Sequence, residues 1–132
     1  MKVHALDHVN IITDDLDRSA RFYEDLLNLE RRDAPAPMTP QMAQWMFNED
    51  GQAIMHLNSP DCPRAYDREV AKGPSGSIHH VAFNCSGFDE TVARLEAMGM
   101  EWQVNTIDSI GLRQIFIMDP HQVLLELNFF AN

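Results

Sequence analysis

The chain repeats itself, and this repeat constrains the fold more than any other feature of the sequence. The segment ALDHVNI returns as SIHHVAF, which sets His8 against His80, 72 residues later. The segment QAIMHLN returns as QVLLELN, which sets His56 against Glu126, 70 residues later. Two matched segments at nearly the same offset indicate a duplicated module, with a side chain capable of binding metal at each matched position.

The repeat predicts one domain, 1–132, built from a first module at 1–58, a linker at 59–77 and a second module at 78–132. The linker is rich in Pro and Gly and lacks a sustained periodicity. A chain of 132 residues is long enough to bury a core without disulfides. Hydrophobic periodicity predicts βαββ or βαβββ for the first module, and the same order for the second.

The expected elements follow from the position of apolar, capping and turn residues. One helix should begin at a cap on Thr13 or Asp14 and end near Asn28, and a second should be opened by Asp89 and followed by Gly99. A short linker helix is also considered at 66–71. The expected strands are 4–12, 44–48, 53–58, 78–84, 102–106, 113–118 and 123–128.

Charge and composition exclude several classes of partner. The formal net charge is −10, which argues against a nucleic acid or an anionic membrane surface as the principal partner. Cys62 and Cys85 match no zinc-finger or CxxC spacing, and no targeting segment is recognisable. No apolar run approaches the roughly 20 residues that span a bilayer. The sequence therefore predicts a reduced, cytoplasmic protein.

The matched positions carry the residue types that bind a divalent transition metal. Imidazole and carboxylate groups are its usual ligands, and a catalytic site keeps one position open for water or substrate. If the modules curl toward each other, His8, His80 and Glu126 can meet, together with His56. A single strand histidine is more often an ordinary core or surface residue. Glu126 is more informative, because it interrupts an apolar strand where a buried carboxylate needs a partner.

His79 competes with His80 as the second-module ligand, because adjacent residues in a strand point to opposite faces. The repeat register favours His80, since His79 matches Asp7. Asp7 and His79 are then either solvent-facing groups or partners that support the neighbouring histidine. His4 and His121 lie at an expected strand start and a turn, where exposure is the simpler interpretation.

Three segments resemble the vicinal oxygen chelate superfamily of glyoxalases, bleomycin-resistance proteins and extradiol dioxygenases: LDHVNIITDDLDRSARFYEDLLNL, HHVAFNCSGFDETVARLEAMG and IFIMDPHQVLLELNF. The resemblance implies an α+β fold of two paired βαβββ modules that form an incomplete, cupped barrel around a divalent metal, commonly in a homodimer. It implies His8, His80 and Glu126 as metal ligands. The remaining ligand position falls on His56, where glyoxalase I usually has a carboxylate.

The resemblance implies a metal-dependent lyase or isomerase whose small-molecule substrate chelates the metal through neighbouring oxygens. Glu126 and His56 are the expected catalytic residues, with His56 as fourth ligand or as base. The metal is iron, manganese, nickel, cobalt or zinc, since mixed nitrogen and oxygen ligands suit all of them. One alternative is an extradiol-type ring-cleavage dioxygenase. Another is a bleomycin-resistance-like protein that binds a cationic aromatic antibiotic without chemistry, through Trp45, Phe47, Trp102 and Phe116.

Overall fold

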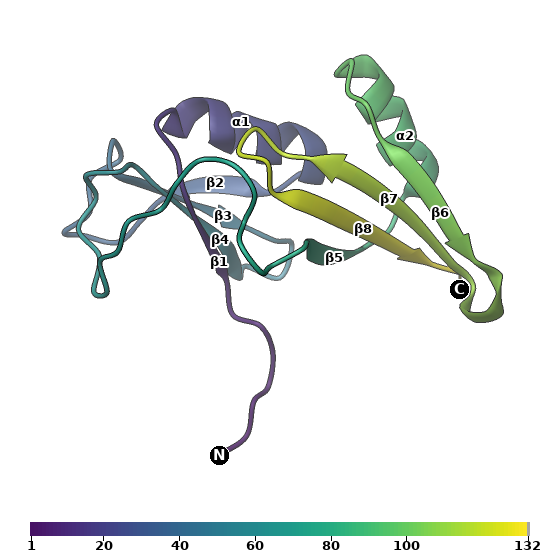
Figure 1. The fold of residues 1–132 in the computed structure, drawn as a ribbon, viewed down its shortest axis with the longest axis horizontal. Helices are drawn as coiled ribbons and strands as arrows, with labels where there is room; N and C mark the ends of the chain where they lie inside the picture. The colour runs from purple at the N-terminus through teal and green to yellow at the C-terminus, as the bar shows by residue number, and fades with distance from the viewer. Residues whose placement is uncertain (132) are drawn as a thin grey trace. The chain divides into compact units, whose positions relative to one another are not determined.

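The computed structural model describes residues 1–131, which form two compact units, 1–70 and 71–131 (Figure 1). Each unit has one helix and one four-stranded sheet, so the predicted α+β class and the two βαβββ modules are confirmed. The short linker helix considered at 66–71 is not formed, because the described chain there consists of a bend and irregular structure. The elements of the first unit are β1 (Val9–Ile12), α1 (Leu16–Leu27), β2 (Glu30–Asp33), β3 (Ala43–Phe47) and β4 (Ala53–Asn58); those of the second are β5 (Val81–Cys85), α2 (Phe88–Ala97), β6 (Gln103–Ile107), the 3₁₀ turn η1 (Asp108–Ile110), β7 (Leu112–Met118) and β8 (Leu124–Phe130).

The two sheets share one topology. Their strand orders are β1-β4-β3-β2 and β5-β8-β7-β6, and neither sheet closes on itself. In each sheet the first strand of the unit pairs in parallel with the last, and the remaining pairs are antiparallel. The last strand of each unit is therefore central, with a neighbour on both sides.

Helix α1 lies against the first sheet through an apolar stripe (Figure 1). Its residues Ala20, Tyr23 and Leu26 recur at helical spacing and are almost completely buried. The expected cap on Thr13 or Asp14 is wrong: Asp15 caps the helix, and its carboxylate accepts a hydrogen bond from the Arg18 backbone N–H. Thr13 is instead buried two residues before the cap, where its hydroxyl oxygen accepts a hydrogen bond from the Asp15 backbone N–H.

Helix α2 covers one face of the second sheet (Figure 1). Leu95 is fully buried, and the Phe88 ring meets Phe129 of β8 edge-on at 5.4 Å between centroids. The guanidinium of Arg113 lies 3.9 Å from the centroid of the same Phe88 ring. These contacts assign one face of the sheet to the helix, so the alternate side chains of β7 and β8 project from the opposite face.

The first strand of each unit is shorter than predicted. β1 begins at Val9 and β5 at Val81, so His4 to His8 and Ile78 to His80 precede their strands. The physical reason is that each is an edge strand with a single neighbour, so it extends only as far as that neighbour. Val9 pairs with Met55 near the start of β4, and Val81 pairs with Leu125 near the start of β8. Among the described residues, no helix is long and apolar enough to cross a membrane.

Candidate functional site

Three aromatic rings are stacked on one another in the first unit. The His56 ring lies in the middle, nearly parallel to its neighbours on either side. The His8 ring is 3.8 Å away between centroids at an interplanar angle of 12°, and the Trp45 ring is 3.9 Å away at 4°. The strand register explains this order, because Trp45 on β3 and Asn10 on β1 are the two cross-strand partners of His56. The predicted ligands His8 and His56 are therefore in direct contact.

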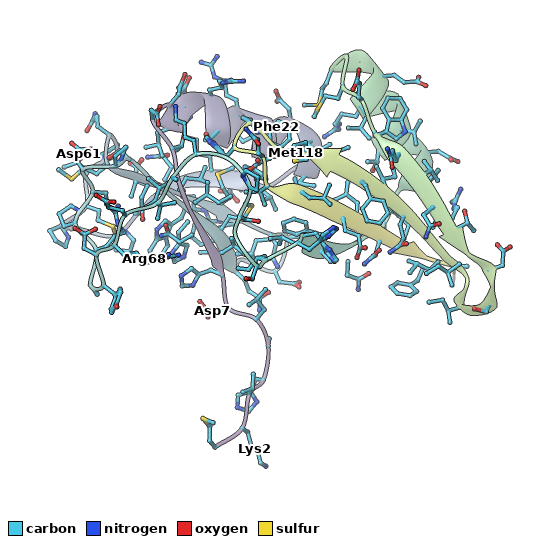
Figure 2. The ribbon with its side chains drawn as sticks, in the orientation of Figure 1. Lys2, Asp7, Phe22, Asp61, Arg68 and Met118 are labelled. Atoms are coloured by element: carbon cyan, nitrogen blue, oxygen red, sulfur yellow. The ribbon has the colours of Figure 1, made fainter. Side chains whose placement is uncertain are left out.

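Asp7 fixes the orientation of the His8 imidazole. Its Oδ2 lies 2.6 Å from Nδ1 of His8, and Figure 2 shows Asp7 where the N-terminal segment enters the first unit. A carboxylate on Nδ1 holds the proton there and leaves the Nε2 lone pair available. The Asp7 side chain is itself 91% exposed, so it faces solvent and also contacts the neighbouring histidine.

His56 is held as a neutral imidazole. Burial lowers its pKa, and the adjacent His8 ring lowers it further. Asp7 and a backbone hydrogen bond at Ala53 act in the opposite direction, but the net pKa remains below the ordinary histidine value. A neutral imidazole has a free nitrogen lone pair at neutral pH, which metal ligation and proton acceptance both require.

The second unit brings together the other two predicted ligands. Nε2 of His80 lies 3.7 Å from Oε2 of Glu126. Nδ1 of His80 lies 3.0 Å from Nδ1 of His79, so the neighbouring side chain occupies the same ring nitrogen that Asp7 occupies on His8. The Glu126 side chain is only 13% exposed, whereas that of His80 is 37% exposed. A carboxylate so covered requires polar partners, as the sequence predicted.

The two pairs occupy equivalent positions in their units. His8 and His80 each lie one residue before the first strand, while His56 and Glu126 lie in the central last strand. In the parallel ladders, His56 is the partner of Asn10 and Glu126 is the partner of Ala82, two residues after the matched histidine in each case.

The structure thus shows two pairs of donors, each within its own unit. Among residues 1–131, no cluster of three or more His, Cys, Asp or Glu side chains could hold a metal ion. The donor types nevertheless suit a divalent transition metal: three imidazoles and one carboxylate, with Nδ1 of His8 paired to Asp7 and Nδ1 of His80 next to His79. The convergence of all four ligands stays a prediction.

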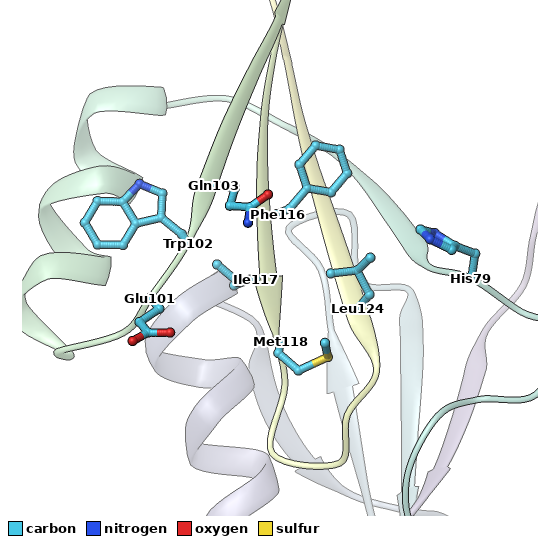
Figure 3. A pocket seen from close by; sticks show the side chains of 8 residues that line it. All are labelled: His79, Glu101, Trp102, Gln103, Phe116, Ile117, Met118 and Leu124. Carbon is cyan, nitrogen blue, oxygen red and sulfur yellow. The ribbon is translucent and has the colours of Figure 1, made fainter.

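A groove lies on the second sheet (Figure 3). Two of its lining residues, His79 and Leu124, are close in sequence to His80 and Glu126. Its volume is about 850 Å³. Trp102 and Phe116 supply its aromatic surface, and Glu101 and Gln103 supply polar groups. No Lys or Arg is found among its described lining residues, which makes the groove better suited to a neutral or cationic ligand than to an anion. The remaining lining residues are His79, Ile117, Met118 and Leu124.

The aromatic residues proposed from the sequence for a cationic ligand divide into two groups. Trp102 and Phe116 line the groove. Trp45 instead stacks on His56. The Phe47 ring makes a cation–π contact within the protein, with the Arg32 guanidinium 4.3 Å from the ring centroid. The sequence analysis missed the link between Trp45 and His56. Cross-strand pairing of β3 with β4 was the signal that would have revealed it.

The family follows from comparison of the whole chain with known proteins. Residues 5–127 match the model of the Glyoxalase/Bleomycin resistance protein/Dioxygenase superfamily. The protein belongs to this superfamily.

Two relatives match over most of the chain. One is Glyoxylase I 4 of Arabidopsis thaliana, 26% identical over 125 residues, which are 93% of this chain and 69% of the plant protein. The other is the uncharacterized protein YwkD of Bacillus subtilis (strain 168), 28% identical over 129 residues, which are 96% of this chain and 98% of that protein.

Solved structures share the fold. Lactoylglutathione lyase from Agrobacterium tumefaciens superposes with a TM-score of 0.65 at 19% identity, covering 98% of this chain and 96% of that one. A variant of the fosfomycin resistance protein FosX from Listeria monocytogenes, complexed with Mn(II) and 1S,2S-dihydroxypropylphosphonic acid, superposes with a TM-score of 0.70 at 17% identity, covering 98% and 93%.

Proposed function

We propose that the protein is a divalent-metal-dependent enzyme acting on a small molecule that binds the metal through two neighbouring oxygens, by lyase or isomerase chemistry. The observation that supports this most is that each of the two repeated units brings two potential metal ligands together at equivalent positions. These are His8 and His56 in the first unit and His80 and Glu126 in the second. Family membership supports it as well, because this superfamily includes lactoylglutathione lyase and FosX, and a FosX variant was solved with Mn(II).

His8, His56, His80 and Glu126 would hold the metal, which would supply Lewis-acid stabilisation of charge developing on the substrate oxygens. Asp7 keeps the His8 proton on Nδ1, and His79 engages Nδ1 of His80. His56, neutral and half-buried between two rings, is the residue best suited to accept a proton near neutral pH if it is not itself a ligand. Glu126 would contribute the negative charge that balances the metal.

The test of the metal site compares two adjacent histidines. Protein purified without added metal is analysed for metal content, alongside the His80→Ala and His79→Ala variants. His80→Ala should lose stoichiometric metal, and His79→Ala should lose much less, because His79 only supports the neighbouring ring. Full metal occupancy in folded His80→Ala would contradict the proposed site, and a reversed order of the two variants would show that the register is displaced by one residue.

A second comparison separates the two roles of His56. In His56→Ala, a lower metal affinity identifies a ligand, whereas unchanged metal with lower turnover identifies a base. Turnover is then tested separately with two kinds of candidate substrate, 2-oxoaldehyde–glutathione adducts and catechols. Oxygen consumption with a catechol would favour the ring-cleavage alternative over the lyase or isomerase.

The aromatic groove favours one second candidate, a protein that binds a cationic aromatic molecule without transforming it. Trp102 and Phe116 offer ring faces, and Glu101 offers a carboxylate. Binding of such a ligand to metal-free protein, retained in His80→Ala and lost in Trp102→Ala, would support this candidate. Binding that requires metal would exclude it.

We further propose a homodimer in the cytoplasm. Dimers are common in this superfamily, and each unit has only about 60 to 70 residues from which to build a core. Both cysteines are free, as expected for a reducing compartment. Sedimentation of a 15.1 kDa monomer at micromolar concentration would contradict the dimer.

A further inference from the structure

We propose that a row of amide side chains across the second sheet positions Glu126 for metal binding, with Asn128 as the residue that acts on it directly. This inference rests on the proposed metal site. The row runs through Asn105 on β6, Gln114 on β7 and Asn128 on β8, which are direct cross-strand partners. All three side chains therefore lie on one face of the sheet, opposite the face that α2 covers.

The amides form a continuous relay that ends on the carboxylate. Asn105 donates through Nδ2 to Oε1 of Gln114 at 2.8 Å. Gln114 donates through Nε2 to Oδ1 of Asn128 at 3.0 Å, and Asn128 donates through Nδ2 to Oε2 of Glu126 at 3.0 Å. This same Oε2 faces Nε2 of His80. The relay thus reaches the atom by which Glu126 approaches the other ligand of its unit.

The direction of the relay follows from chemistry. An ionised carboxylate only accepts hydrogen bonds, so Asn128 must present its NH₂ group to Glu126 and its oxygen to Gln114. Gln114 must then present its own NH₂ to Asn128 and its oxygen to Asn105. Gln114 is 7% exposed, so little water is available to substitute for either partner. Each amide consequently fixes the orientation of the next.

The relay restrains a side chain that must remain charged and in place. Glu126 has rotatable bonds and only 13% exposure, and the Asn128 N–H gives its carboxylate a fixed donor beside His80. Hydrogen bonds in a chain polarise one another, which strengthens the last bond to the carboxylate. Partners of this kind orient a ligand before the metal arrives, and their loss typically lowers metal affinity about 10- to 100-fold.

The relay predicts that a substitution at Asn105 alters the Asn128 amide and Glu126, although Asn105 contacts neither of them. Asp at position 105 can only accept, so Asn105→Asp should turn the Gln114 amide, which turns the Asn128 amide and places an oxygen against Glu126. Asn84 provides the matched control: it is the partner of Asn128 on β5, in the same row but outside the relay. Asn84→Asp introduces the same charge one strand from Glu126, whereas Asn105 is two strands away.

The experiment measures cobalt(II) affinity by competition with a chelator, and the side-chain NH₂ resonances of the metal-free protein by NMR, in the full chain. Asn128→Leu should lower affinity about 10-fold or more. Asn105→Asp should lower it in the same direction and shift the Asn128 NH₂ resonances, whereas Asn84→Asp, whose added charge attracts the cation without reversing the relay, should not lower the affinity. Thermal unfolding confirms that each variant is folded.

The inference is overturned if Asn105→Asp leaves the Asn128 resonances and the cobalt affinity unchanged, or if Asn84→Asp lowers the affinity as strongly as Asn105→Asp. Failure of the proposed function has a different signature. Wild-type protein would then bind no cobalt, and the NMR comparison in the metal-free protein alone would decide whether the relay exists.

Discussion

Removing the Trp45 ring should weaken metal binding without removing any ligand. The ring stacks on His56 at 3.9 Å and 4°, on the face opposite His8, so it limits rotation of the imidazole. A stacked aromatic pair contributes about 0.5–1.5 kcal/mol beyond the area it buries. If this stacking free energy holds His56 in the orientation that binds the metal, Trp45→Leu should lower metal affinity roughly 2- to 10-fold, since 1.4 kcal/mol is a factor of ten in affinity.

The assay is a cobalt(II) competition titration at a temperature where all variants are fully folded. This condition matters because Trp45 also packs against the buried cluster of Ala34, Ala43 and Cys62, so its loss will lower the melting temperature as well. Trp45→Phe keeps a ring against His56 and should retain affinity within about twofold. Trp102→Leu removes the same ring from the other unit and should leave affinity unchanged.

Two results would refute the reasoning about Trp45. Wild-type affinity in Trp45→Leu would show that the stack does not orient His56 for the metal. An equal loss in Trp45→Phe and Trp45→Leu would show that the indole contributes through something other than stacking. A single-tryptophan protein, Trp102→Phe, adds an independent signal, because metal binding next to the stack should quench the emission of Trp45.

Three further predictions concern the scaffold. Gln122 adopts a left-handed conformation, φ +63°, in the turn before β8, so Gln122→Gly should stabilise the protein by about 0.5–1 kcal/mol and raise its melting temperature by a few degrees. Asp15→Ala should cost about 1 kcal/mol by removing the α1 cap, measured by urea unfolding, with Asp15→Asn close to neutral. Burial raises the pKa of Cys85 to about 11 from 9.0, so at pH 8 its alkylation in the native protein should be roughly 100-fold slower than that of an ordinary thiol. Since the folded state favours the neutral thiol, the contribution of this thiol to stability is present below pH 9 and is lost as the pH rises toward 11. An alkylation rate in the native protein equal to the rate in urea would contradict the burial of Cys85.

The sequence predicted the duplicated fold because its signals are local and occur twice. The α1 stripe, the turn at His121 and the strand around Glu126 all follow from periodicity or turn chemistry. The extent of β1 and β5 did not follow, because a strand ends where its partner ends, and pairing is not visible along the chain. The helix cap shifted to Asp15 for a related reason: the Thr13 hydroxyl is used by the Asp15 N–H.

The sequence proposed the donor residues, but it did not predict the contacts that surround them. The donor identities came from the repeat, whereas the ring stack on His56 and the amide row ending on Glu126 depend on which residues face each other across strands. Trp45 shows the difference clearly. From the sequence it is one aromatic among several suited to a ligand, and in the structure its ring lies on His56.

The central position of the last strand in each sheet has a consequence for the order of folding. β8 pairs with β7, which is nearby in sequence, and with β5, whose Val81 is the partner of Leu125, 44 residues further along the chain. Contacts of such long sequence separation form late, because the loop-closure entropy is lost before the contact compensates for it. During synthesis the first unit can complete its sheet once β4 has emerged, while the second must wait for β8. Glu126 and Asn128 therefore reach their places in the final step, and a slow-folding variant of β8 should accumulate a protein whose first sheet is native and whose second is still open.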